Sequence, residues 1–308
     1  MPPERHVMLS GLHFLLTYSC THQCDHCFLF SAPGAGGTFT VAQIEAVLDE
    51  AVRLGCIDRV CFEGGEPTLY FPVMREGIRL ARRRGIGGGV VTNAYWALSE
   101  EDAELWLRPL AELGLDSASV SDDDLHYDPQ AGVRAARVKA AAERLGMSAK
   151  VLETVRPRVE MVDGKPAVRG TVMFRGRAAV NLAPGMPTRP WSNFTKCTHE
   201  DLANPKRIHV DCYGNAHLCQ GLSMGNFWET PLADLVRAYD GEKHPIAGPL
   251  IRGGPARLIE EYGLPHADEY VDDCHLCFEA RVALRQRFPG LLAPARVYGR
   301  DEAGNPVR

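Results

Sequence analysis

The 308-residue chain lacks the features that would place it in a membrane-spanning, secreted or nucleic-acid-binding class. No uninterrupted apolar run is long enough to cross a bilayer. The N-terminal stretch MPPERHVMLSGLHFLL lacks a signal-peptide hydrophobic region followed by a small-residue cleavage site. The formal net charge of -5 disfavours broad phosphate-driven binding to nucleic acid. We therefore expect a cytoplasmic protein with no membrane partner, for which nucleic acid is a disfavoured partner.

What the chain does contain is ten cysteines in an otherwise ordinary globular composition, with 45% hydrophobic and 24% charged residues. The length suggests two domains. Disulfides are rare in the cytoplasm, so metal ligation is the better interpretation of the cysteines.

Three of these cysteines, Cys20, Cys24 and Cys27, lie within one short polar stretch, CTHQCDHC. Thiolates at this spacing can converge on one metal centre. A cubane cluster has four irons that are usually held by cysteine, so three local ligands leave one iron open. An open coordination position usually indicates chemistry and not scaffolding. The pattern predicts an enzyme.

The Cys-x3-Cys-x2-Cys pattern resembles the cluster loop of the radical S-adenosylmethionine (radical SAM) superfamily. Residues 62–67 (Phe-Glu-Gly-Gly-Glu-Pro) resemble its Gly-Gly-Glu-Pro stretch, and residues 92–94 (Thr-Asn-Ala) resemble its Thr-Asn-Gly/Ala strand end. Residues 121–126 (Ser-Asp-Asp-Asp-Leu-His) resemble its Ser-x-Asp-x-x-His motif. The order and spacing of these motifs favour the family over a chance match.

The resemblance implies that Cys20, Cys24 and Cys27 hold a 4Fe–4S cluster whose open iron binds S-adenosylmethionine, and that they form the catalytic centre. It also implies a set of cofactor-binding positions: Phe28, Gly64, Gly65, Glu66, Asn93, Ser121 and Asp123. Phe28 is expected either to pack on the adenine or to belong to the core. The two glycines let the backbone approach a ligand, and Glu66 is expected to accept from the amino group of the cofactor.

The first half of the chain alternates strand and helix patterns, which predicts a parallel sheet covered by helices. The expected strands are 12–18, 59–62, 89–92, 117–121 and 149–155, with a sixth at 171–174. Thr40 and Gln43 predict a capping box for the first helix, and Gly55 predicts its end. By resemblance, residues 8–180 form a radical SAM core, a partial (β/α)6 TIM-like barrel. Sites in such folds lie at the carboxyl ends of the strands.

Residues 181–288 are expected to form a small second domain, and residues 289–308 a peripheral C-terminal tail. A hairpin is predicted from strands 207–211 and 216–219, and a short helix at 232–239. The Gly- and Pro-rich stretch 241–255 is expected to be a loop.

The second domain carries a second set of cysteines and resembles the SPASM or twitch auxiliary-cluster domains of radical SAM enzymes. The resemblance implies one extra 4Fe–4S cluster in a twitch-like domain. Its expected ligands are Cys197, Cys219, Cys274 and Cys277, with Cys212 as a substitute. A structural zinc site built from the same thiolates stays open as an alternative.

The expected function is hydrogen-atom abstraction from a peptide or a small molecule by a 5′-deoxyadenosyl radical, with the second cluster assisting an oxidation. A reducing partner such as flavodoxin or ferredoxin is implied. The alternatives are a peptide maturase whose leader-binding partner is separate and, in another class, a non-catalytic iron–sulfur or zinc protein. One of Arg156, Arg158, Arg175 and Arg177 is a candidate partner for a carboxylate, and the sequence does not choose among them.

Overall fold

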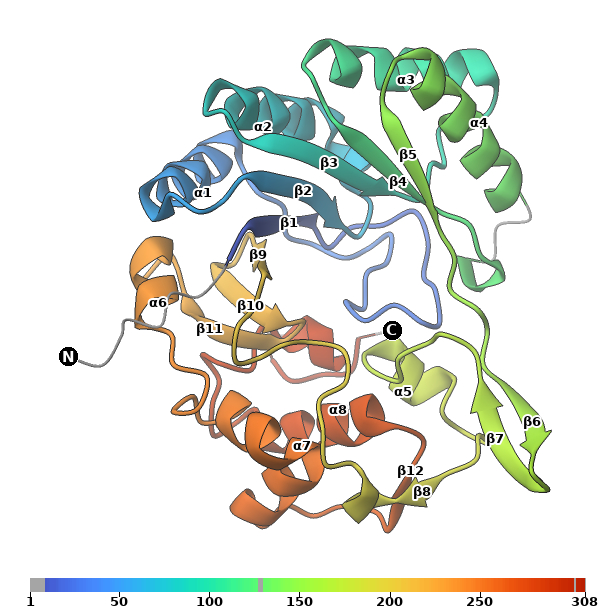
Figure 1. Cartoon of the computed structure of the whole chain (residues 1–308), viewed down its shortest axis with the longest axis vertical. Helices are drawn as coiled ribbons and strands as arrows, with labels where there is room; N and C mark the ends of the chain where they lie inside the picture. Colours follow the sequence, from blue (N-terminus) through green and yellow to red (C-terminus); the bar gives the residue numbers. More distant parts are fainter. Residues whose placement is uncertain (1–8, 127–129, 302, 308) are drawn as a thin grey trace.

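The structure, a computed structural model, describes residues 9–126, 130–301 and 303–307. The predicted domain start at residue 8 and residues 302 and 308 of the predicted tail lie outside this range. An eight-stranded sheet organises the molecule, in the order β11-β10-β9-β1-β2-β3-β4-β5 (Figure 1). Its strands are β1 (Gly11–Thr17), β2 (Arg59–Gly64), β3 (Gly87–Thr92), β4 (Ser117–Ser121), β5 (Ser148–Leu152), β9 (Arg207–Asp211), β10 (Asn215–Cys219) and β11 (Leu222–Asn226).

Neighbouring strands from β9 to β5 pair in parallel, and β10 pairs antiparallel with both β9 and β11. Helices α1 (Val41–Leu54), α2 (Phe71–Arg83), α3 (Glu100–Glu112) and α4 (Ala131–Arg144) follow β1 to β4 in turn and cover the outer face of the sheet (Figure 1). The predicted mixed α/β fold with a parallel sheet is confirmed. The capping box of Thr40 and Gln43 and the left-handed Gly55 that ends α1 are also as predicted.

Side chains along β1 alternate between the two faces of the sheet, as strand geometry requires. Leu12 and Phe14 are fully buried under the helices, and Phe14 stacks on Phe62 of β2 with ring centroids 5.0 Å apart. His13 points to the opposite, inner face, where it meets Glu63 of β2. The sheet therefore has an apolar outer face and a partly polar inner face.

The prediction of a sixth barrel strand at residues 171–174 is wrong, because that segment is irregular. Before it the chain forms a separate hairpin, β6 (Arg158–Val162) and β7 (Lys165–Arg169), which turns at Asp163 and Gly164 with positive φ angles. Thr171 then bonds the backbone of Val155, beyond the end of β5, so this segment adds no strand beside β5. The sheet stays open at β5, and the sixth parallel strand is β9, which pairs with β1.

The predicted hairpin of β9 and β10 is confirmed, and β11 extends it. These strands belong to the predicted second domain, yet they continue the sheet of the first; the division into two domains stays a prediction. The other elements of this half are α5 (Arg177–Asn181), β8 (Arg189–Pro190), α6 (Leu232–Ala238), α7 (Ala247–Tyr262), β12 (Glu269–Tyr270) and α8 (Asp273–Leu284). Single 3-10 turns occur at Pro67–Tyr70, Asp124–His126, Trp191–Asn193 and Ala295–Tyr298.

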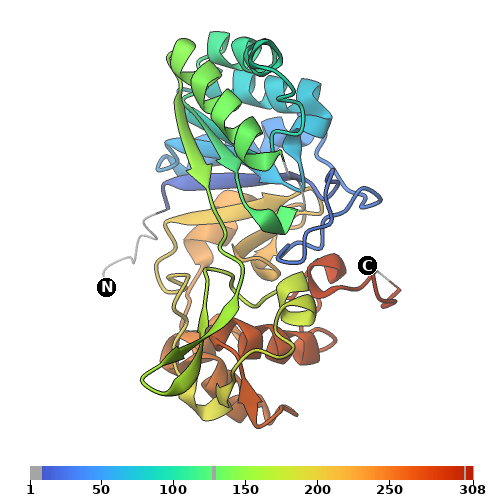
Figure 2. The ribbon, with the colours of Figure 1, turned by 90° about the vertical axis from the view of Figure 1, so that its right-hand side faces the viewer.

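Figures 1 and 2 place β3 to β5 with their helices at one end of the long axis, and α7 and α8 at the other. The loop expected at 241–255 is wrong in its second half, since α7 begins at Ala247. The glycines act at a kink inside this helix: Gly254 has φ +64, and a Cβ there would lie 2.2 Å from the backbone nitrogen of Lys196. No helix in the described part of the chain is both long and apolar enough to span a bilayer.

The tail is not peripheral between residues 292 and 298. Tyr298 is 4% exposed, stacks on Phe278 and donates a hydrogen bond to the carbonyl of Gly221 at 2.6 Å. Arg296 donates to the carbonyl of Phe30, just after the cysteine loop. The tail therefore packs on both halves of the chain.

A buried carboxylate, Asp211 at the end of β9, connects the β9–β10 turn with β1. It accepts hydrogen bonds from the Tyr18 hydroxyl at 2.8 Å and from the backbone N–H of Asn215 at 2.9 Å. The Nε2 atom of His217 lies 3.1 Å away. Burial raises the pKa of Asp211, but His217 and Asn215 outweigh it and hold the pKa below its ordinary value.

Replacing this carboxylate tests the connection. We expect Asp211→Ala to lower the free energy of unfolding by at least about 3 kcal/mol, because several buried donors lose their acceptor. The control, Glu143→Ala, removes an exposed carboxylate of α4 and is expected to change stability by less than about 0.5 kcal/mol. Denaturant titration measures both values. A loss below about 1 kcal/mol in Asp211→Ala would contradict this description of the β9–β10 turn.

Candidate functional site

A cavity of about 320 Å³ lies at the carboxyl ends of the parallel strands. It brings together residues from six separate segments, five of which include or follow the ends of β1 to β5, as the rule for parallel sheets predicts. Its lining includes all the residues predicted for the first site except Glu66: Cys20, Cys24, Cys27, Phe28, Gly64, Gly65, Asn93, Ser121 and Asp123.

The cysteine loop follows β1 and presents its sulfurs to this cavity. Cys20 and Cys24 are buried and Cys27 is half-buried. Backbone N–H groups of His22 and Ser31 point at the sulfurs of Cys20 and Cys27, each at 3.4 Å. Burial raises the pKa of Cys20 to about 12 and raises that of Cys24 as well. Deprotonated Cys20 and Cys24 would therefore need a bound cation to balance their charge. The clustering of the three thiols suits such a cation, and the N–H groups would stabilise the thiolates.

The separation of the sulfurs bears on which cation fits. Thiolates around a single zinc ion lie about 3.8 Å apart, given Zn–S bonds of about 2.3 Å. In the described part of the chain, no three cysteine sulfurs all lie within 4.8 Å of one another. At least one sulfur–sulfur separation in each cysteine set therefore exceeds 4.8 Å, more than a tetrahedral zinc site has.

Gly64 and Gly65 bring the end of β2 against the end of β1. Gly64 has φ +133, and a Cβ on Gly65 would lie 2.1 Å from the carbonyl oxygen of Ser19. The N–H of Gly65 donates to the carbonyl of Thr17 at 2.7 Å. The glycines line the cavity, but the close approach that requires them is to the backbone leading into the cysteine loop.

Glu66 lies behind the cavity wall and is fully buried. Its carboxylate accepts hydrogen bonds from the Thr92 hydroxyl and the Asn93 N–H, both at 2.8 Å, and from the Thr68 hydroxyl at 2.6 Å. Burial raises the pKa of Glu66, and these hydrogen bonds oppose the rise. In this structure Glu66 orients the end of β3, and its direct contact with a cofactor stays a prediction.

Asn93 connects β3 to the cysteine loop. Its Nδ2 atom donates to the Thr21 hydroxyl at 2.9 Å and lies 3.8 Å from the sulfur of Cys20. Its side-chain oxygen accepts from the N–H of Tyr95. The amide is therefore held in one orientation beside the first cysteine.

The segment after β4 forms another wall. Ser121 lines the cavity, and Asp123 accepts from the N–H of Leu125 and lies 2.7 Å from Nδ1 of His126. The ring of His126 meets that of His26 edge-to-face at 5.1 Å. Burial lowers the pKa of His26 to about 4, so its imidazole is neutral at neutral pH. These groups supply polar hydrogen-bonding atoms opposite the glycines.

Two arginines that the sequence did not distinguish lie against the cysteine loop and the residues that follow it. Arg175 lines the cavity, lies over the Phe28 ring at 5.1 Å and donates to the sulfur of Cys219 at 2.9 Å. Arg177 donates to the carbonyls of Cys24 and Ser31 at 2.6 and 2.9 Å. The other two candidates pair with acidic residues: the half-buried Arg156 with Asp124, and the exposed Arg158 with Glu160.

The second cysteine set surrounds two buried guanidinium groups. Arg175 interacts with Cys219 and Cys274, and Arg281 interacts with Cys277, Cys219 and Cys274. Cys197 is a neighbour of Cys219. The four predicted ligands therefore share one neighbourhood.

Cys212, the predicted substitute ligand, lies elsewhere, beside Gly37 and Asp211. It has no described interaction with the other four cysteines of the second half of the chain.

The glycine contact in the first site predicts a measurable cost. We expect Gly65→Ala to lower the free energy of unfolding by about 1–3 kcal/mol, because a Cβ there collides with backbone. Gly36→Ala is the control, since nothing lies within 4 Å of its Cβ position. Its stability should change by less than about 1 kcal/mol. Equal stability of the two variants would show that the strand ends do not approach as described.

Comparisons with known proteins agree with this geometry. Residues 14–156 match the family model described as Radical SAM superfamily. The "Putative peptide biosynthesis protein YydG" of Bacillus subtilis (strain 168) is 22% identical over 245 residues, which cover 79% of this chain and 70% of that protein. Residues 14–156 are thus similar to a radical SAM domain.

Among solved structures, that of BtrN in complex with AdoMet and 2-DOIA has a TM-score of 0.50 and 16% identity, covering 74% of this chain and 82% of that one. BtrN in an open conformation has a TM-score of 0.44 and 15% identity, covering 80% and 95%. The likeness to the BtrN complex concerns the fold alone. The family match and the Bacillus relative together support the radical SAM superfamily for this chain.

Proposed function

We propose that this protein is a radical SAM enzyme that abstracts a hydrogen atom from a peptide or small-molecule substrate. The observation that carries the proposal is the convergence of Cys20, Cys24 and Cys27 with Gly64, Gly65 and Asn93 on one cavity at the strand ends. A non-catalytic metal protein needs no cavity beside its thiolates.

The residues that would hold the cluster are Cys20, Cys24 and Cys27, with S-adenosylmethionine in the adjoining cavity. When bound, this pair of cofactors supplies a 5′-deoxyadenosyl radical for hydrogen-atom abstraction. The protein itself binds and orients the cofactor and the substrate, and it excludes water from the cavity. Apolar side chains of Leu29 and Met173 shield one part of the cavity.

The polar atoms of the cavity orient what binds there. The Arg175 guanidinium supplies a fixed cation suited to a carboxylate. Asn93 and Ser121 offer neutral hydrogen-bonding groups on another wall. Flavodoxin or ferredoxin is our proposed electron donor.

Anaerobic reconstitution with iron and sulfide tests the activity. We expect the reduced protein to convert S-adenosylmethionine to 5′-deoxyadenosine, measured by liquid chromatography. Alanine variants of Cys20, Cys24 or Cys27 should lose at least about 99% of this product, because the cluster loses a ligand. Cys56→Ala is the matched control, since that thiol is exposed and outside the cavity. A fully loaded protein that forms no 5′-deoxyadenosine would favour an electron carrier.

We further propose an auxiliary 4Fe–4S cluster on Cys197, Cys219, Cys274 and Cys277 in a twitch-like domain. Buried charges need partners of opposite sign. Arg175 and Arg281 are both buried, and neither forms an ion pair with a carboxylate in the described part of the chain. Thiolates held by a cluster would balance these cations, and the spacing of the sulfurs favours a cluster over zinc.

Metal content tests the second cluster. We expect about eight irons per wild-type chain and about four in Cys274→Ala, because each cubane holds four irons. This variant should still form 5′-deoxyadenosine, since the first cluster keeps its ligands. Cys212→Ala is the control and should keep the full iron content. Zinc in place of the second set of irons would contradict the proposal.

For the substrate, we propose a peptide, with a small molecule as the alternative. The support is the name of the Bacillus relative, "Putative peptide biosynthesis protein YydG". An auxiliary cluster there would suit a net oxidation in which it accepts an electron from a substrate radical. The support is that Arg175 lines the cavity and donates to the sulfur of Cys219, a proposed cluster ligand.

A further inference from the structure

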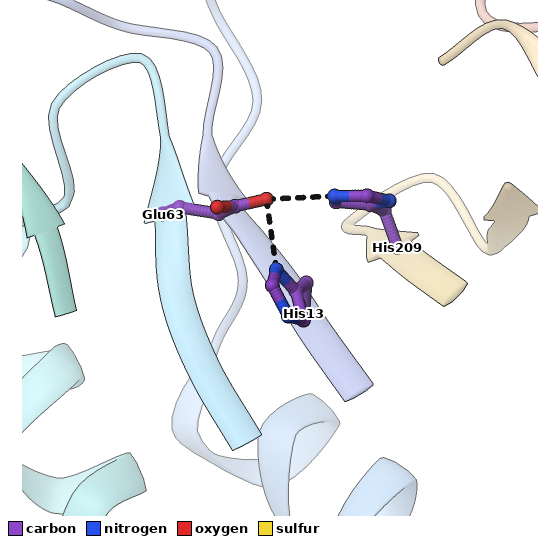
Figure 3. A group of neighbouring side chains, drawn as sticks. All are labelled: His13, Glu63 and His209. Carbon is purple, nitrogen blue, oxygen red and sulfur yellow. Dashed lines mark ion pairs between the residues drawn. The ribbon is translucent and has the colours of Figure 1, made fainter. Parts of the chain in front are cut away.

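The inner face of the sheet carries three metal-ligand side chains that the proposed function does not use. His13 of β1, Glu63 of β2 and His209 of β9 point toward one another (Figure 3). One carboxylate oxygen of Glu63, Oε1, lies 3.4 Å from Nδ1 of His13 and 2.9 Å from Nε2 of His209. The three ligand atoms all lie within 4.8 Å of one another.

Strand register produces this grouping. His13 lies directly opposite His209 on one side and Cys61 on the other, and Glu63 is the next residue on the same face of β2. The two imidazole rings meet edge-to-face at 4.9 Å. Because all three residues are on paired strands, the site is preorganised by the sheet.

The distances suit an ion. Ligand atoms bonded to one metal at about 2.1 Å lie about 3.0 Å apart in octahedral and about 3.4 Å apart in tetrahedral geometry. The two separations from Glu63, 2.9 and 3.4 Å, fall at these values. Two imidazoles and one carboxylate are a donor set typical of divalent iron, manganese and zinc.

Partners other than an ion are scarce around these atoms. In the described structure neither Lys nor Arg pairs with Glu63, whose side chain is 17% exposed. Within the same residues, the side-chain oxygen of Gln220 is buried with no hydrogen-bond partner, and the buried His13 Nδ1 has only the 3.4 Å contact with Glu63. The Gln220 amide nitrogen lies 3.4 Å from His209 Nε2. Buried polar atoms with so few protein partners are typical of a site that holds an ion or an ordered water.

We propose that His13, Glu63 and His209 bind one divalent first-row transition-metal ion. Glu63 also lines the cavity, so the open coordination positions of the ion would face the cavity. These positions would suit an oxygen atom of a molecule bound there. The metal site stands apart from the proposed radical chemistry, and its test needs no turnover.

The test uses Mn²⁺, which favours nitrogen and oxygen ligands over thiolates. Protein reconstituted with its iron–sulfur clusters is titrated with Mn²⁺, and free ion is measured by electron paramagnetic resonance. We expect one bound Mn²⁺ per chain. The Kd should rise at least tenfold in Glu63→Gln and in His13→Phe. The second variant keeps a ring at a position that is only 26% exposed.

The matched control is His126→Phe, which removes a ligand from the other group of two histidines and one carboxylate, His26, Asp123 and His126. Its Kd should stay within twofold of wild type. Pulsed resonance of the wild-type complex should show coupling to imidazole nitrogen, a result that depends on no variant. The proposal is overturned if Mn²⁺ does not bind or if no nitrogen coupling is seen. It is also overturned if the Kd rises tenfold in His126→Phe and not in the Glu63 and His13 variants.

Discussion

The parallel pairing of β1 with β2 and with β9 is the constraint on which the rest of the structure depends. It places the cysteine loop, which follows β1, beside the Gly-Gly-Glu turn that follows β2. The close approach of Gly65 to Ser19 is possible only because no side chain intervenes. The same pairing sets His13, Glu63 and His209 side by side on the inner face. Both candidate sites thus derive from one strand register.

The segment from Arg175 to Arg177 connects the two cysteine sets. Arg175 contacts Phe28 in the first site and Cys219 in the second, while Arg177 bonds the carbonyl of Cys24. Gly176 fits between them with φ +60, where a Cβ would lie 2.4 Å from the Cα of Phe28. Positive charge is therefore fixed between the two groups of thiols.

Much of the first site was predictable from sequence because its signals are local. The three cysteines, the Gly-Gly-Glu-Pro turn and the strand-end residues Asn93 and Ser121 each lie in a short motif. The alternation of strands and helices places these motifs at one edge of the sheet.

Contacts between residues distant in the chain were not predictable. Tyr18 bonds Asp211, 193 positions away, and β9 takes the sixth parallel place that the sequence pattern assigned to residues 171–174. The role of Arg175 depends on such a contact, and so does the grouping of His13 with His209. The Gly-rich stretch 241–255 likewise predicted a loop, although its second half belongs to α7. The kink in α7 depends on a tertiary contact, the close approach of Gly254 to Lys196.

The central claim is that the cluster on Cys20, Cys24 and Cys27 leaves one iron without a protein ligand, facing the cavity. Electron paramagnetic resonance of the reduced protein tests it most directly, in the Cys274→Ala variant, so that one cubane is observed alone. Adding S-adenosylmethionine should shift the g-values of that cubane, because the amino and carboxylate groups of the cofactor would bind an open iron. An identical spectrum with and without saturating S-adenosylmethionine would contradict the account.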